Sequence, residues 1–129
     1  MLVCVYYRVA ADDARRVIAG VREFQRTLQR TSGVNSAEVL LRCDLPSPAS
    51  SAPPPDVPDY PVPSSEPSAI VPAAEPTLME TYRLELPAAG AAADAVLRAF
   101  LARLETASLP HAALLRGARH VELFSPCVL

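Results

Sequence analysis

Apolar residues recur at two spacings along this chain, and these spacings predict an alternation of strands and helices. Apolar positions alternate with others in four stretches, Leu2 to Val9, Ala37 to Cys43, Thr77 to Leu86 and Arg119 to Phe124, and such alternation is typical of β-strands. Steps of three and four residues, typical of amphipathic helices, follow the first and the third of these strands. The predicted order is strand, helix, strand, strand, helix, strand.

The two predicted helices each carry one apolar stripe. The stripe consists of Ala14, Val17, Ile18, Val21, Phe24 and Leu28 in the first helix, and of Ala93, Val96, Leu97, Phe100, Leu101 and Leu104 in the second. We expect Asp12 or Asp13 to cap the first helix and Gly33 to follow it as a left-handed stop. Pro110 is expected to end the second helix, with one further helical turn between His111 and Arg116.

Two β-α-β halves in succession predict an α+β fold, the ferredoxin-like βαββαβ sandwich, over a single domain of residues 1–129. Right-handed crossovers put both helices on one face of a four-stranded antiparallel sheet, with the strands in the order four, one, three, two. The other sheet face is bare. We expect Tyr6, Leu40, Tyr82 and Phe124 there, and therefore predict a homodimer in which the same face of a second subunit covers them.

The chain changes in composition between the second and third strands. Eleven of the fourteen prolines fall in the 31 residues from Pro46 to Pro76, together with serines, alanines and four acidic residues. Proline lacks the backbone donor that helices and inner strands need, so this insertion is predicted to be an extended, disordered loop. Docking of its Pro-x-x-Pro spacings on aromatic grooves is the weaker alternative, because such spacings arise by chance in a proline-rich stretch.

The charged residues exclude several classes of function. The net charge is −2 and all twelve basic residues are arginines, so there is no lysine for a Schiff base or a phosphate-binding loop. The arginines form no clustered stripe of the kind that binds nucleic acid. His111 and His120 are the only histidines, too few for a three-histidine metal site. We expect neither a metal nor a cofactor.

The cysteines and the N-terminal residues predict a cytoplasmic protein. Cys4, Cys43 and Cys127 are odd in number and lack Cys-x-x-Cys spacing, which indicates inert, reduced thiols. The apolar run after Met1 has no basic leader and is too short for an export signal or a membrane span. We therefore expect no membrane association.

The predicted strand order brings six residues into one candidate pocket on the bare face. They are Tyr6, Arg8, Glu80, Tyr82, His120 and Glu122. In an enzyme, Glu80 or His120 would accept a proton, Arg8 would anchor an oxyanion or a carboxylate, and the tyrosines would be orienting donors. In a structural interpretation, which we favour, Arg8 and Glu80 form an ion pair across the central strands, because buried charges need partners whether or not they catalyse.

The facing of the third strand has an alternative. Leu84 and Leu86 share the parity of Glu80. The alternative to the bare-face placement is that the strand faces the other way, with no bulge intervening, because side chains alternate strictly between the two faces of a sheet.

Three segments carry a resemblance to known proteins. They are Val5-Tyr6-Tyr7-Arg8-Val9, Thr77-Leu78-Met79-Glu80-Thr81-Tyr82 and the stretch from Arg119 to Cys127. In these segments the chain resembles a family of short betaproteobacterial proteins classed as a domain of unknown function. Its layout also resembles the dimeric α/β barrels, which include cofactor-independent monooxygenases and haem-degrading enzymes. This second resemblance implies a fold and no particular chemistry.

Three functions remain open from the sequence. We favour a homodimeric module that binds a small apolar or anionic molecule between two bare sheet faces. The second is a cofactor-independent monooxygenase or isomerase, and the third is a purely structural or interaction protein. A closed cavity with converging polar groups is expected for the first two, and a flat, filled interface for the third.

Overall fold

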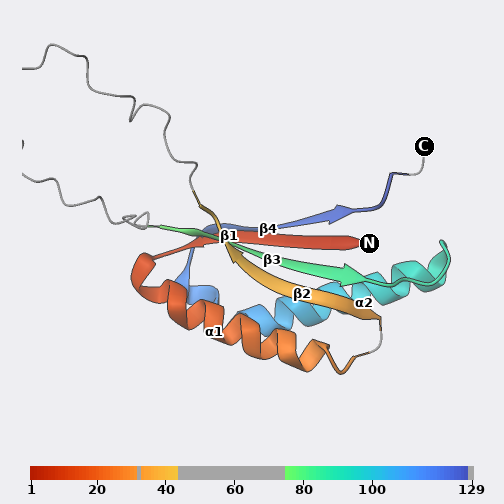
Figure 1. Cartoon of the computed structure of the whole chain (residues 1–129), viewed down its shortest axis with the longest axis horizontal. Coiled ribbons are helices and arrows are strands. Elements are labelled where there is room, and N and C mark those ends of the chain that lie inside the picture. Colours follow the sequence, from red (N-terminus) through yellow and green to blue (C-terminus); the bar gives the residue numbers. More distant parts are fainter. Residues whose placement is uncertain (32, 44–74, 128–129) are drawn as a thin grey trace, which may run out of the picture.

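The computed structural model describes residues 1–31, 33–43 and 75–127, and its elements follow the predicted order (Figure 1). The elements are strand β1 (Leu2–Val9), helix α1 (Ala11–Leu28), strand β2 (Val34–Leu41), strand β3 (Thr77–Leu84), helix α2 (Ala91–Ser108), the 3-10 helix η1 (Leu109–Leu114) and strand β4 (Leu115–Phe124). The predicted disordered loop from Pro46 to Pro76 lies outside the described residues except for its last two. None of the described helices is long and apolar enough to cross a membrane.

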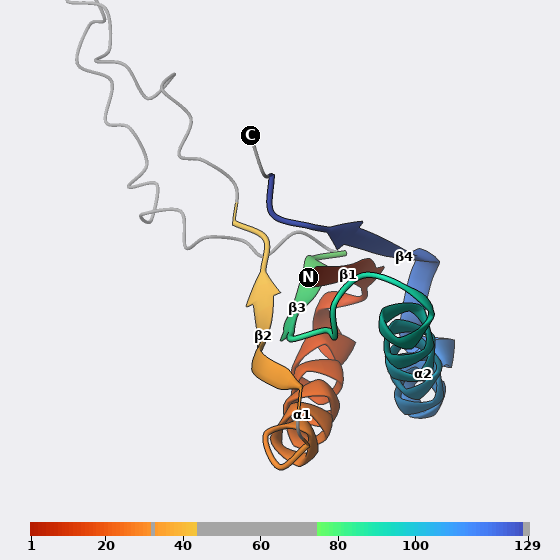
Figure 2. The same ribbon diagram turned by 90° about the vertical axis from the view of Figure 1, so that its right-hand side faces the viewer.

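The four strands form one antiparallel sheet in the order β2-β3-β1-β4, which confirms the ferredoxin-like topology and its central pair of strands. Both helices lie on one face of the sheet, and no described helix lies on the other (Figures 1 and 2). Strands β1 and β3 pair without a register shift, from Leu2 opposite Arg83 to Arg8 opposite Thr77. Directly opposite residues point to the same face, so this register decides which side chains meet the helices.

The core fills the space between the sheet and the two helices. Its buried members are Val3, Val5, Tyr7 and Val9 of β1, Leu78, Tyr82 and Leu84 of β3, Val17, Val21 and Leu28 of α1, and Phe100 and Leu104 of α2. The alternation predicted for the first strand is thus confirmed. Each large apolar side chain buried in this way stabilises the fold by about 1.5–3 kcal/mol relative to an exposed one.

The ends and faces of the helices correct two predictions. Helix α1 begins at Ala11, so neither Asp12 nor Asp13 caps it; both lie in the first turn, where their charges complement the helix dipole. The cap is Ala10, whose carbonyl accepts the backbone N–H of Asp13 at 3.0 Å. Val96 of α2 is 43 % exposed instead of buried, because it lines an open groove between α2 and the sheet.

Three strand boundaries also differ from the prediction. Strand β2 runs from Val34 to Leu41 rather than from Ala37 to Cys43, and β3 ends at Leu84 rather than Leu86. Strand β4 begins at Leu115, ahead of the predicted start at Arg119, because its pairing with β1 continues beyond a register shift between Tyr6 and Arg8. Gly117 lies within this shift with a φ of 81°, a left-handed conformation that interrupts the alternation by which a strand is recognised.

Candidate functional site

The register divides the six residues of the candidate pocket between the two faces of the sheet. Glu80 pairs with Val5 and Tyr82 with Val3, so both side chains point towards the helices, where their exposed fractions are 3 % and 0 %. The sheet face without described helices, here called the open face, keeps the other four residues, Tyr6, Arg8, His120 and Glu122. The expected grouping of all six on the bare face is therefore corrected, and the alternative facing of the third strand is the one observed.

Inside the core, two tyrosines hold the carboxyl group of Glu80. The Tyr7 hydroxyl donates to Oε1 at 2.6 Å, and the Tyr82 hydroxyl donates a short hydrogen bond to Oε2. Burial and the neighbouring Glu80 charge raise the pKa of both tyrosine hydroxyls, so both keep their protons and act as donors at neutral pH. Both carboxyl oxygens thereby act as acceptors, which meets the requirement that buried polar atoms be hydrogen-bonded.

Arg8 has a different partner from the one predicted. Its Nη1 atom lies 3.6 Å from Oε2 of Glu75, and the two side chains are 59 % and 46 % exposed. The predicted ion pair between Arg8 and Glu80 is wrong, because the two residues occupy opposite faces of the sheet. The tyrosine hydroxyls, rather than an arginine, therefore satisfy the buried carboxyl group.

Two residues that the sequence assigned to no site complete this buried cluster. His111 of η1 is 9 % exposed, and its ring centroid lies 6.4 Å from that of Tyr7. Arg119 shares the face of Val121, and its charge acts on both tyrosines and on His111. Nε2 of His111 and Nε of Arg119 are buried without a hydrogen-bond partner among the described residues.

The protonation of His111 depends on these neighbours. Burial lowers the pKa of the imidazole, and the positive charge of Arg119 lowers it further, against the opposing effect of Glu80. His111 is therefore neutral at neutral pH and presents one donor and one acceptor nitrogen. The sequence predicted the helical turn that carries His111, but a helical turn alone does not show what its side chain meets.

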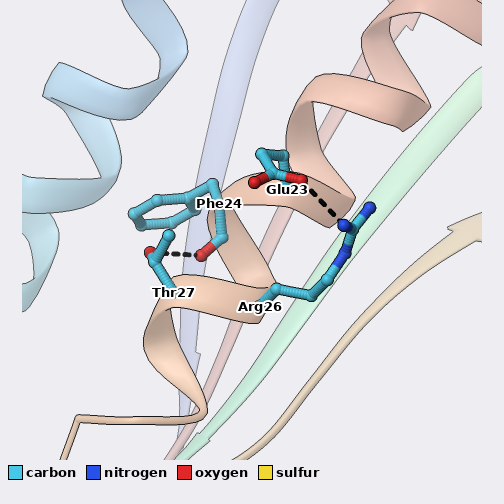
Figure 3. A network of polar contacts seen from close by, with 4 residues as sticks. All are labelled: Glu23, Phe24, Arg26 and Thr27. Atoms are coloured by element: carbon cyan, nitrogen blue, oxygen red, sulfur yellow. Dashed lines mark hydrogen bonds and ion pairs between the residues drawn. The ribbon is translucent and has the colours of Figure 1, made fainter.

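A small cavity lies above Glu80 between the two helices. Its volume is about 10 Å³, and its lining consists of Val21, Phe24, Glu80, Leu104, Ala107, Ser108 and His111. A space of this size holds one water molecule. Figure 3 shows the Phe24 ring on the side of α1 that faces α2, while the Glu23 and Arg26 ion pair, at 2.8 Å, lies on the other side. The Phe24 ring meets the ring of Tyr82 edge-on at 6.4 Å and thus closes one side of the cluster.

The open face holds a second cluster, formed by three of the predicted residues. The Tyr6 hydroxyl donates to Oε1 of Glu122 at 2.7 Å, and this hydrogen bond raises the pKa of the Tyr6 hydroxyl. The rings of Tyr6 and His120 stack with their centroids 5.1 Å apart. Cys4 lies beside them and is 7 % exposed, and burial raises the pKa of its thiol. This thiol therefore stays protonated and unreactive at neutral pH.

The residues of the open face fall into four rows that cross the strands. Each row is named after its main members and is given in the strand order β2, β3, β1, β4. The basic row is Arg42, Thr77, Arg8 and Arg116, and the apolar row is Leu40, Met79, Tyr6 and His120. The acidic row is Glu38, Thr81, Cys4 and Glu122, and the fourth row is Ser36, Arg83, Leu2 and Phe124. A hollow of about 410 Å³ adjoins the fourth row and is lined in part by Leu2, Arg83 and Phe124.

The fold and the two clusters define a ferredoxin-like α+β domain with a buried carboxyl group on one side of its sheet and an aromatic open face on the other. No family model, curated protein or solved structure matches the chain. The resemblances to short betaproteobacterial proteins and to the dimeric α/β barrels therefore stay predictions. Within residues 1–31, 33–43 and 75–127, no group of three or more His, Cys, Asp or Glu side chains is placed to hold a metal ion.

The hydrogen bonds to Glu80 lead to a prediction about stability. We expect Tyr7→Phe to lower the free energy of unfolding by about 2 kcal/mol, because it leaves a buried carboxyl oxygen without its donor. A double-mutant cycle that combines Tyr7→Phe with Glu80→Gln should show a coupling of about 1 kcal/mol or more, measured by urea denaturation. The control cycle combines Arg8→Met with Glu80→Gln and should show almost no coupling. Equal coupling in the two cycles would contradict the placement of Glu80.

The lowered pKa of His111 leads to a prediction about pH. The unfolded chain binds a proton to this imidazole near pH 6.5 and the folded chain only at lower pH, so stability is lost as the pH falls below about 6.5. Urea denaturation of wild type and His111→Gln at a series of pH values should show a smaller acid loss in the variant. His120→Gln is the matched control and should follow the wild type. A variant curve parallel to that of the wild type would argue against the buried position of His111.

Proposed function

We propose that this chain is a homodimeric module that covers its open sheet face with a second copy of itself and binds a small molecule there. The observation that carries the proposal is the apolar row, in which Leu40, Met79 and Tyr6 cross β2, β3 and β1 in the middle of a face without helices and the row ends at the stacked ring of His120 on β4. Leu40, at its outer end, is 42 % exposed. A second copy removes this continuous apolar surface from water, and two-fold symmetry supplies an identical surface to cover it.

The hollow beside the fourth row supports a class of ligand. Leu2 and Phe124 offer apolar surface and Arg83 offers a cation, and the volume of about 410 Å³ falls in the range of small-molecule sites. A guanidinium group pairs with a carboxylate through two parallel hydrogen bonds. The ligand that fits this lining is a small apolar carboxylate, and a second sheet would close the open side of the hollow.

A second candidate, an isomerase or a cofactor-independent monooxygenase, is favoured by the buried cluster. There Nε2 of His111, without a partner among the described residues, belongs to a side chain that shares a cavity with Glu80. Such a pair of an acid and a base suits proton transfer. The cavity of about 10 Å³ has room for a water molecule and none for a substrate. For that reason the binding module is the leading proposal.

The dimer is tested at the centre of the apolar row. Wild-type protein should sediment as a dimer at micromolar concentration, and Met79→Arg should sediment as a monomer, because symmetry brings the added cation into the interface twice. Leu109→Arg is the matched control, since Leu109 lies in η1 and is 66 % exposed; it should remain dimeric. Monomeric wild-type protein would remove the proposal.

The ligand is tested separately by native mass spectrometry of protein purified from its host. The wild-type dimer should carry an added mass that disappears in Arg83→Gln, because the variant loses the cation that anchors the carboxylate. Arg98→Gln, an exposed arginine on α2, is the control and should keep the added mass. A ligand-free wild-type dimer, or a ligand retained in Arg83→Gln, would contradict this assignment while leaving the dimer in place.

A further inference from the structure

The charges of the open face are ordered along the strands. The basic row, the apolar row and the acidic row follow one another, so opposite charges lie on the two sides of the apolar row. In β2, β3 and β1 the rows are two residues apart, about 6.8 Å, so the basic and acidic rows lie at similar distances from the apolar row between them; on β4 the register shift puts Arg116 opposite Arg8 and thereby in the basic row. The end residues of both rows, Arg42, Arg116, Glu38 and Glu122, are exposed.

A two-fold dimer of stacked sheets has two simple orientations on such a face. If the axis runs across the strands, along the apolar row, each strand faces its own copy and each basic row faces an acidic row. If the axis runs parallel to the strands, β2 faces β4 of the other copy, each basic row faces a basic row and each acidic row faces an acidic row. Like charges placed opposite each other disfavour an interface, so the two orientations differ in electrostatic free energy.

We propose that the two-fold axis of the homodimer runs along the apolar row, so that Arg116 pairs with the partner's Glu122 and Arg42 with the partner's Glu38. This inference rests on the proposed dimer and adds its geometry. Stacked sheets lie about 10 Å apart, a distance that one arginine and one glutamate side chain span together. In each copy Tyr6 already occupies Oε1 of Glu122, while no residue that the structure describes bonds Oε2, which can therefore accept from a guanidinium group.

Charge reversal and its restoration test this geometry in the full chain. Sedimentation equilibrium should show that Arg116→Glu and Glu122→Arg each raise the dimer Kd about tenfold or more. The double variant Arg116→Glu with Glu122→Arg should return to within about threefold of wild type, because the pair is then restored with its charges exchanged. Arg22→Glu, an exposed position on α1, is the control and should leave the Kd unchanged.

The second proposed pair, Arg42 with the partner's Glu38, controls for an indirect effect of losing the hydrogen bond between Tyr6 and Glu122. Arg42→Glu, Glu38→Arg and their combination should repeat the pattern of loss and recovery. If instead Arg116→Glu strengthens a wild-type dimer, the axis runs parallel to the strands and this inference fails while the proposed dimer stands. A dimer whose Kd is unchanged by every charge reversal would likewise contradict this inference and leave the proposed dimer in place. A monomeric wild type would overturn the proposed function itself.

Discussion

The two hydrogen bonds from Tyr7 and Tyr82 to Glu80 constrain the rest of this structure. The acceptor lies on β3, and its donors lie on β1 and β3, all on the helix side of the sheet. A slip of one residue in the pairing of β1 with β3 would turn one strand's row over and separate Tyr7 from Glu80. A buried carboxyl group without donors costs more than a single hydrogen bond contributes. The central register is therefore specified by a polar contact as well as by apolar packing.

The same register arranges the open face. Once Glu80 and Tyr82 point to the helices, Met79 and Thr81 must point the other way and lie beside Tyr6 and Cys4. The apolar row and its flanking charged rows thus follow from the register in which Tyr7 and Tyr82 donate hydrogen bonds to the buried carboxyl group of Glu80. The buried cluster and the proposed dimer face share one set of strands, although their side chains lie on opposite sides of the sheet.

The shift in the pairing of β1 with β4 has a comparable effect at the sheet edge. It lies between Tyr6 and Arg8 and includes Gly117, whose left-handed φ an alanine would adopt only with strain. From Arg119 to Phe124 the side chains alternate regularly, so that Arg119 shares the side of Val121 and His120 stacks on Tyr6, and the shift then brings Arg116 opposite Arg8. Bulges commonly redirect side chains in this way. The shift therefore adds Arg116 to the end of the basic row on the open face.

The sequence by itself determined the order of the elements, the strand order and most of the core, because periods of two and of three to four residues directly record which side of an element is buried. It also brought Tyr6, His120 and Glu122 together correctly. Only the tertiary structure decided the facing of Glu80, since its parity agreed with that of Leu84 while its charge suggested the solvent side. Arg119 shares the side of Val121 by the alternation that predicted the last strand, but His111 joined the buried cluster only through a 3-10 helix, whose contacts local periodicity does not encode.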